Sequence, residues 1–301
     1  MKIPLTPPFS KGEISFPLQW GEYVPPFRKG GKGGFETGYP DEFNMSMVYH
    51  LKLSKKSIKG ARIALLPGDP GRVPAIASAI NNEGASEIAC NREFRTWLSV
   101  MDSNPVVVTS TGIGGPSAAI AIEELAQLGI KTFIRVGTTG ALQRHIKAGD
   151  VVITTASVRI DGTSEHYAPL EYPAVADYGV LNALVEAAKA IKVRCHVGIT
   201  ASSATFYPGQ ERVDTFSGYV IRDLAGSKKE WEQLGVLNYE MESATLLTMC
   251  SAMGLRAGCV TGVISERSEK EKIILSKIRS AEGNAIAVAV AALRRLYPPP
   301  P

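Results

Sequence analysis

Residues 61–72 read Ala-Arg-Ile-Ala-Leu-Leu-Pro-Gly-Asp-Pro-Gly-Arg. A short apolar run is followed at once by a turn of proline and glycine, and a helical pattern begins near residue 74. Strand, tight turn and helix in this order are typical of α/β proteins. This stretch therefore predicts an α/β fold.

The same alternation of short β-branched runs and helical patterns continues from Ala61 to about residue 296. It predicts strands at 61–66, 94–101, 105–110, 131–136, 150–157, 196–202 and 256–264. It predicts helices at 74–81, 116–128, 178–191, 241–253 and 279–296. Because strands outnumber helices before Ser157, we expect a mixed, partly barrel-like sheet flanked by helices.

The two ends of the chain differ from its middle. Residues 1–44 contain seven prolines and seven glycines, and their five basic and five acidic residues cancel. We predict a low-complexity, disordered extension there, with a polyproline ligand for a partner domain as the alternative. Residues 45–297 are expected to form one domain, and 298–301 a proline tail.

Composition limits the classes of function. The chain has 301 residues, 45% apolar and 21% charged, with a net charge of +4. We see no apolar run of about 18–20 residues and no secretory signal, so we expect a cytoplasmic protein without a membrane partner. The dispersed basic residues favour small anionic ligands over nucleic acid. Four widely spaced cysteines predict reduced thiols.

Three glycine-rich turns are candidates for anion binding. The turn 66–72 offers backbone N–H groups and Arg72 to an anion, and 110–117 is a second turn between a strand and a helix. Its pattern lacks the third glycine of a dinucleotide fingerprint. In 135–141, Arg135 interrupts a buried strand just before two loop threonines. A buried arginine needs an anion or a carboxylate partner, and Glu123 or Glu124 is the alternative to a bound oxyanion.

Two later segments carry amides, cations and carboxylates. In 205–212, Gln210 and Arg212 would point the same way on an extended segment and read one planar polar edge, with Phe206 stacked on its face. A plain surface loop is the alternative. In 238–243, two carboxylates open a predicted helix. One of them can cap or pair the helix, and the other can accept from two vicinal hydroxyls.

These motifs carry a resemblance. Leu-Pro-Gly-Asp-Pro-Gly-Arg-Val, Arg-Glu-Phe-Arg-Thr-Trp, Ser-Thr-Gly-Ile-Gly-Gly-Pro-Ser, Gly-Thr-Thr-Gly-Ala, Phe-Tyr-Pro-Gly-Gln-Glu-Arg and Asn-Tyr-Glu-Met-Glu-Ser occur in this order. From about Val48 to Leu296 the chain resembles the uridine-cleaving branch of the nucleoside phosphorylase-I family. The motif Phe-Tyr-Pro-Gly-Gln-Glu-Arg is the one that separates this branch from purine phosphorylases and nucleosidases.

The resemblance implies a fold and an activity. The fold would be a three-layer α/β/α single domain, assembled as a homohexamer of three dimers with sites shared across each dimer. The activity would be reversible phosphorolysis of uridine to uracil and ribose 1-phosphate in pyrimidine salvage. Inorganic phosphate would be the co-substrate, and no cofactor would be needed for catalysis. A structural monovalent cation such as K⁺ would lie between subunits.

The resemblance also assigns roles by position. Phosphate would be held by Gly68, Arg72, Arg135, Thr138 and, from the dimer partner, Arg92. Ribose would be held by Met241, Glu242 and the partner's His50. Uracil would be held by Phe206, Gln210 and Arg212, with Arg267 near its carbonyl oxygens, and Gln210, Arg212 and Arg267 would be catalytic. The cation would be held by Glu93, Ile113 and Ser117.

Two departures from the family pattern bear on these roles. Residues 263–270 are densely charged where a flap is expected, which predicts altered loop closure, and Ala204 replaces a usual aspartate. The rival functions are a purine phosphorylase, a nucleosidase that uses water, and a nucleoside-binding protein without turnover. The cationic set of Arg72, Arg92 and Arg135 favours phosphate over water as the nucleophile.

Overall fold

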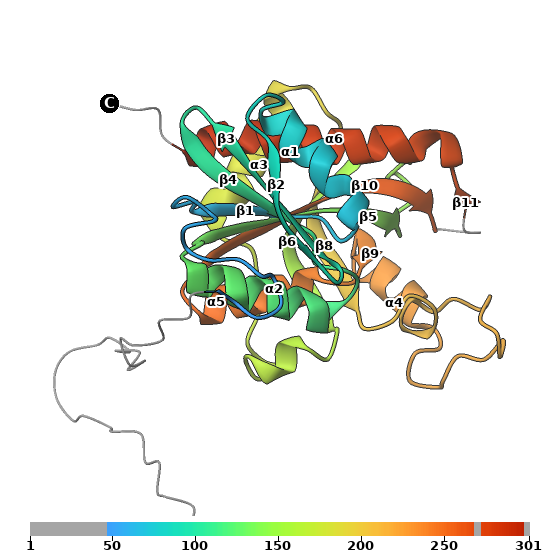
Figure 1. Cartoon of the computed structure of the whole chain (residues 1–301). Coiled ribbons are helices and arrows are strands. Elements are labelled where there is room, and N and C mark those ends of the chain that lie inside the picture. The colour runs from blue at the N-terminus through green and yellow to red at the C-terminus, as the bar shows by residue number, and fades with distance from the viewer. Residues whose placement is uncertain (1–46, 268–271, 298–301) are drawn as a thin grey trace, which may run out of the picture. The chain divides into compact units, whose positions relative to one another are not determined.

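The computed structural model describes residues 47–267 and 272–297. These residues form a mixed sheet with helices on two sides (Figure 1). The expectations for 1–44 and for the proline tail lie outside the described residues.

One continuous sheet runs through the molecule in the order β11-β10-β6-β8-β9-β5-β1-β4-β3-β2, with β7 paired to β6. A further pairing of β10 with β5 closes β10, β6, β8, β9 and β5 into a ring. This ring confirms the partly barrel-like sheet. The strands are β1 Ile63–Leu66, β2 Ser86–Asn91, β3 Phe94–Met101, β4 Asn104–Thr109, β5 Thr132–Ala141, β6 Val151–Ile160, β7 Ala174–Val175, β8 Cys195–Ser203, β9 Asn238–Glu240, β10 Arg256–Glu266 and β11 Lys272–Ile273.

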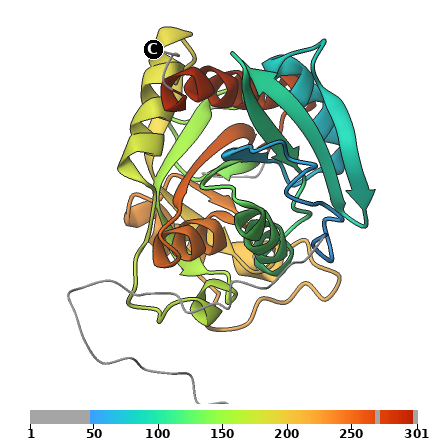
Figure 2. The ribbon, with the colours of Figure 1, turned by 60° about the vertical axis from the view of Figure 1, so that its left-hand side comes forward.

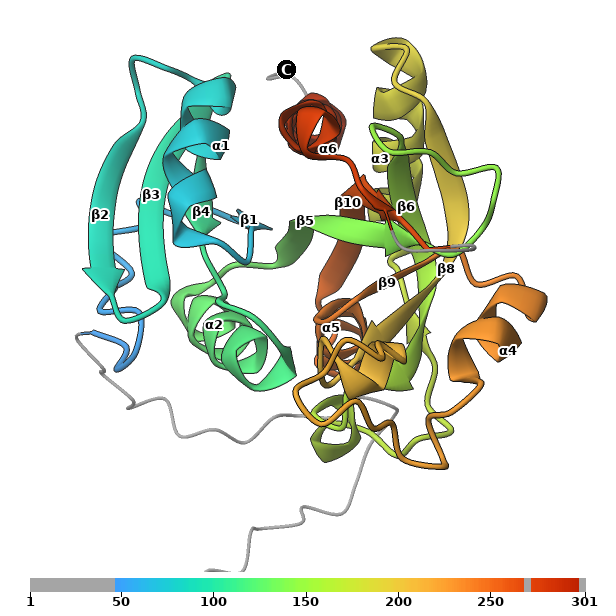
Figure 3. The ribbon, with the colours of Figure 1, turned by 90° about the vertical axis from the view of Figure 1, so that its right-hand side faces the viewer.

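Helices cover the sheet in two layers. One apolar cluster joins α1, α3 and α6 to the sheet, and a second joins α2 and α5 to it. Figure 3 shows α6 above β5 and β10 and α2 and α5 below them, and Figure 2 shows α2 and α5 side by side. The three-layer arrangement is confirmed. The helices are α1 Val73–Ile80, α2 Gly115–Leu128, α3 Tyr178–Ala190, α4 Ser227–Gln233, α5 Ser243–Ala252 and α6 Leu275–Leu296.

Local sequence sets the ends of α2 and the packing of α6. Helix α2 has proline in its first turn and ends before Gly129, whose φ of 112° is one that glycine adopts without strain. Helix α6 lies so close to β10 that a Cβ on Gly262 would fall 2.2 Å from the backbone oxygen of Ala281. A side chain at Gly262 would therefore push α6 away from the sheet.

Two local predictions were wrong, each because the sheet extends further than expected. The threonines after Arg135 lie within β5 rather than in a loop, because β5 pairs with β10 up to Ala141. The helix predicted from 241 begins at Ser243, because 238–240 forms β9 between β5 and β8. Strands β2, β7, β9 and β11 and helix α4 were not predicted.

The cysteines agree with the prediction of free thiols, and Cys250 and Cys259 are buried. None of the helices within the described residues is long and apolar enough to cross a membrane.

Candidate functional site

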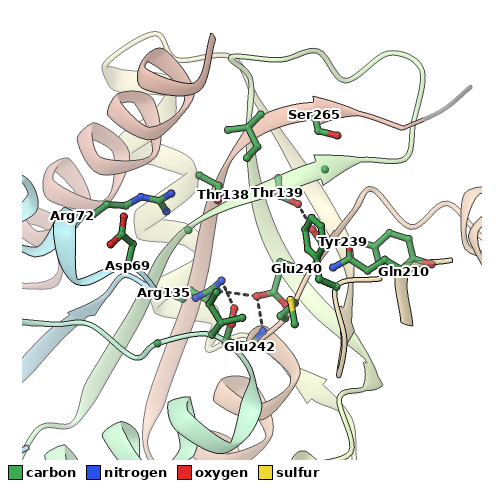
Figure 4. Close-up of a pocket in the computed structure, with 18 of the residues that line it drawn as sticks. Asp69, Arg72, Arg135, Thr138, Thr139, Gln210, Tyr239, Glu240, Glu242 and Ser265 are labelled. Atoms are coloured by element: carbon green, nitrogen blue, oxygen red, sulfur yellow. Dashed lines mark hydrogen bonds and ion pairs between the residues drawn. The ribbon is translucent and has the colours of Figure 1, made fainter. Parts of the chain in front are cut away.

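A cavity of about 620 Å³ opens where β5, β9 and β10 meet the turn after β1 and the segment before α4. A volume of this order is typical of small-molecule sites. Its lining residues include Gly68, Asp69, Arg72, Glu93, Ile113, Arg135, Thr138, Thr139, Phe206, Gln210, Arg212, Tyr239, Glu240, Met241, Glu242, Ile264 and Ser265. In Figure 4, Arg72 and Gln210 lie on opposite sides, with Arg135 and two glutamates between them.

A buried ion cluster forms the floor of this cavity. Arg135 Nε donates to Glu240 Oε2 at 2.8 Å, and Arg135 Nη2 pairs with Glu242 Oε2. Burial alone would lower the pKa of Arg135, but the charges of Glu242 and Glu240 raise it, so the guanidinium stays charged. Its Nη1 is buried and has no hydrogen-bond partner among the described residues. A buried cation with a spare donor is suited to an anionic ligand.

The two glutamates of the cluster have different environments. Glu240 accepts from the backbone N–H groups of Glu242 and Ser243 and from the Ser243 hydroxyl, so it caps the start of α5. Burial would raise the pKa of Glu240, but Arg135 and these donors hold it below its usual value. Burial raises the pKa of Glu242, and Arg135 opposes this only in part. Glu242 also accepts from the N–H of Gly114. Glu240 therefore caps the helix, as the sequence allowed for one of the two carboxylates, and both residues line the cavity.

The alternative partners considered for Arg135 were wrong. Glu124 instead accepts from the Nδ1 of His50 at 2.7 Å and from the backbone N–H groups of His50 and Leu51. Glu123 and Glu124 lie on α2, whereas the carboxylates that reach Arg135 come from the last residue of β9 and from the residue just before α5.

The turn after β1 and the second glycine-rich turn meet at one side of the cavity. A Cβ on Gly68 would lie 3.0 Å from the carbonyl oxygen of Gly112, so the two turns approach as closely as backbone allows. Asp69 accepts from the N–H of Gly71 at 2.7 Å and shapes the first turn. Arg72 Nη2 pairs with Glu282 of α6 at 2.6 Å. Thr138 on β5 lines the cavity beside these turns.

The opposite side is built by the segment before α4. The expectation of an extended segment was wrong: Pro208–Gln210 is a 3₁₀ turn, and Glu211 has a φ of 51°. The turn still brings Gln210 and Arg212 to the cavity, where both are buried. The guanidinium of Arg212 lies 3.9 Å from the ring centre of Phe206, a cation–π contact.

Arg267 is not among the lining residues of the cavity. Its Nη2 donates to the carbonyl oxygen of Gln210 at 2.7 Å, and its Nη1 donates to Gln210 Oε1 at 3.3 Å. Its guanidinium also lies 5.2 Å from the ring centre of Tyr239. Arg267 thus supports Gln210 from behind.

Three other candidates also lie outside the lining set. His50 is held by Glu124, and Arg92 is exposed in the turn between β2 and β3 with a φ of 55°. Ser117 donates to Glu93 Oε1 at 2.8 Å. Glu93 and Ile113 do line the cavity, and Ile113 is 78% exposed. The roles of these residues stay predictions.

Sequence reasoning gave no role to Asp69, Tyr239, Ile264 and Ser265, although all four line the cavity. Asp69 and Tyr239 lie inside the quoted motifs, but the roles in binding were predicted for other residues of those motifs. Ile264 and Ser265 belong to residues 263–270, predicted as an altered flap, but they lie in β10 near its C-terminal end; residues 268–270 lie outside the described residues. Their position at the end of a buried strand was the available signal, because ligand sites in α/β proteins lie at such ends.

Known proteins resemble the chain over most of its length. A profile of the phosphorylase superfamily matches residues 62–294. A uridine phosphorylase of Escherichia coli (strain K12) is 57% identical over 251 residues, which are 83% of this chain and 98% of that protein. A uridine phosphorylase of Thermococcus kodakarensis is 50% identical over 225 residues, 75% of this chain and 79% of that protein. A guanosine phosphorylase of Halorubrum lacusprofundi is 41% identical over 220 residues, 73% and 83% respectively.

Proposed function

Because the chain belongs to the phosphorylase superfamily, we propose that its cavity holds phosphate, ribose and a base in three adjoining places. Relatives named uridine phosphorylase are 54–57% identical to it over most of its length. The chain is a pentosyltransferase that cleaves uridine with phosphate to give uracil and ribose 1-phosphate.

Phosphate binds between the glycine-rich turns and β5. The spare Nη1 donor of buried Arg135 carries this assignment. Arg72 and the hydroxyl of Thr138 line the same side of the cavity, and Gly68 leaves room for the anion to approach the backbone. The cluster of one arginine and two glutamates has an excess negative charge, so Arg72 and the partner's Arg92 supply the further positive charge that a phosphate dianion needs.

Ribose binds over Glu242 and the backbone of Met241. Glu242 lies beside Arg135 at the floor, so a sugar bound there has its C1′ next to the phosphate. An ionised carboxylate accepts from two vicinal hydroxyls, which suits the 2′- and 3′-hydroxyls. His50 of a dimer partner would approach the 5′-hydroxyl.

Uracil binds against Phe206 and the polar groups of Gln210 and Arg212. The amide and guanidinium meet the polar edge of the base, and the Phe206 ring lies along its face. Cleavage of the glycosidic bond builds positive charge on ribose and negative charge on uracil. Phosphate stabilises the first charge, and Arg212 and Gln210 stabilise the second. Each such donor contributes about 2.7–4 kcal/mol, by analogy with an oxyanion hole.

A second copy of the chain completes the site in this proposal. The assembly is a cytoplasmic homohexamer of three dimers, in which His50 and Arg92 serve the neighbouring cavity. Glu93, Ser117 and Ile113 would hold a K⁺ ion at the subunit boundary. Hydrogen bonds from its own backbone and from Ser117 hold the pKa of Glu93 below its usual value, so it offers an ionised oxygen ligand of the kind hard cations prefer.

The decisive experiment is uridine cleavage with and without inorganic phosphate, repeated with thymidine and inosine. We expect uracil release that requires phosphate and a preference for uridine over inosine. Release that proceeds equally in phosphate-free buffer would indicate a nucleosidase. Tight uridine binding without release would indicate a binding protein.

A further inference from the structure

Glu211 stands between the two residues that meet the base, yet it does not line the cavity. Its Oε1 accepts from the backbone N–H of Gly226 at 2.6 Å, and its Oε2 accepts from that of Lys228 at 2.6 Å. Both donors belong to the start of α4. Glu211 also holds a φ of 51°, which a side-chain-bearing residue adopts only when its surroundings fix it. The carboxylate thus anchors a strained backbone position to α4.

Lys228 makes a second link from the same helix. Its Nζ donates to the backbone oxygen of Arg267 at 2.8 Å. Arg267 in turn donates to Gln210 through both terminal nitrogens. The base-reading segment is therefore tied to α4 at two points, through Glu211 directly and through Lys228 and Arg267 behind Gln210.

Helix α4 is itself fastened to the barrel. Trp231 of α4 packs against an apolar cluster that contains Leu142, Ala201, Val236 and Tyr239. Gln143, just after β5, donates to the backbone oxygens of Glu232 and Val236 at 2.9 and 2.8 Å. Tyr239 of this cluster also lines the cavity. These contacts thus join the helix to the wall of the site.

We propose that Glu211 and Lys228 are positioning residues that use α4 to hold Gln210 and Arg212 in the geometry that reads the base. This rests on the proposed function of the cavity. Neither residue touches the substrate. Selectivity needs polar groups held within a fraction of an ångström, and a 1 Å displacement costs about 100-fold in rate. Loss of either link should therefore impair base recognition and leave the phosphate side intact.

The test compares Glu211→Gly and Lys228→Met with wild type in phosphorolysis of uridine and inosine. Glycine tolerates the φ of 51°, so Glu211→Gly removes the carboxylate without adding backbone strain. We expect its kcat/KM for uridine to fall about 10- to 100-fold, its preference for uridine over inosine to shrink, and its KM for phosphate to stay within about 2-fold. Lys228→Met should show the same pattern with smaller changes. Lys228→Arg keeps the positive charge and should retain most of the wild-type activity.

Exposed neighbours provide matched controls on the same helix. Lys229→Met and Glu230→Gln remove the same charges from exposed positions and should behave as wild type. If wild type cleaves uridine with phosphate and the variants of Glu211 and Lys228 behave like these controls, the positioning role is wrong and the proposed function stands. Equal losses for uridine and phosphate would also overturn it, because they indicate a general structural role. A wild-type protein without phosphate-dependent uridine cleavage would instead overturn the proposed function.

Discussion

Replacing Arg135 by methionine should destabilise the fold and remove phosphate binding together. Methionine has nearly the length of the arginine stem but no charge, so the change leaves Glu240 and Glu242 buried side by side without their common cation. Glu240 and Glu242 are 3% exposed, which leaves solvent little access to screen them. Removing one partner of a buried ion pair costs about 3–5 kcal/mol, because an uncompensated charge stays behind.

That cost should appear as a lower melting temperature. A domain of this size loses about 2–4 °C per kcal/mol, so Arg135→Met should melt about 6–20 °C below wild type at pH 7. Calorimetry in phosphate-free buffer measures the shift. Adding phosphate should raise the melting temperature of wild type, because the ligand binds only the folded state, and should leave that of the variant unchanged.

The destabilisation of Arg135→Met should depend on pH through the two buried carboxyl groups. In the variant, burial without a cation raises the pKa of both carboxyl groups above their values in the unfolded chain. As pH falls, the folded state therefore binds protons at a higher pH than the unfolded state does, and this stabilises the folded state. The difference in melting temperature between variant and wild type should therefore shrink from pH 7 to pH 5. The double variant Arg135→Met with Glu240→Gln should recover part of the loss. A melting temperature within about 2 °C of wild type, or a gap that widens on acidification, would refute this account of the cluster.

The remaining predictions concern the substrate. Arg212→Ala should lower kcat/KM for uridine far more than phosphate affinity, and an equal loss of both would mean that the guanidinium does not meet the base. Glu242→Ala should lower kcat/KM for uridine by a larger factor than kcat/KM for 2′-deoxyuridine. An equal loss for the two substrates would exclude a contact with the 2′-hydroxyl. Because burial raises the pKa of Glu242, uridine affinity in phosphate-free titrations should weaken as pH falls through a pKa above the usual value for glutamate, and Glu242→Gln should bind weakly with a flat profile. If Arg92 acts across a dimer, subunit exchange between Arg92→Ala and Arg212→Ala should restore about a quarter of wild-type activity, and exchange without recovery would place Arg92 in its own site.

The sequence predicted those parts of the molecule that depend on local pattern. Strand β3 was predicted with its observed ends, because its alternating apolar residues stand between clear turns. The glycine-rich turns and Arg135, which the resemblance assigned to one phosphate site, line the same cavity, and their role in phosphate binding stays a prediction. The segment around Glu211 was not predicted, because its left-handed φ is fixed by contacts with residues 226 and 228 and not by its own residue type.

The ion cluster shows why the rest of the site needed the three-dimensional structure. Arg135 and Glu240 lie 105 residues apart and meet because β9 pairs with both β5 and β8. Strand β9 has three residues, which is too short for periodicity to reveal, and its neighbours in the sequence resemble the start of a helix. Local pattern therefore predicted a bound oxyanion at Arg135 and offered only Glu123 or Glu124, on the helix just before it, as the alternative carboxylate partners. The closure of the barrel decided otherwise: it brings the carboxylate that caps α5 beneath the arginine, and leaves Glu124 to hold His50.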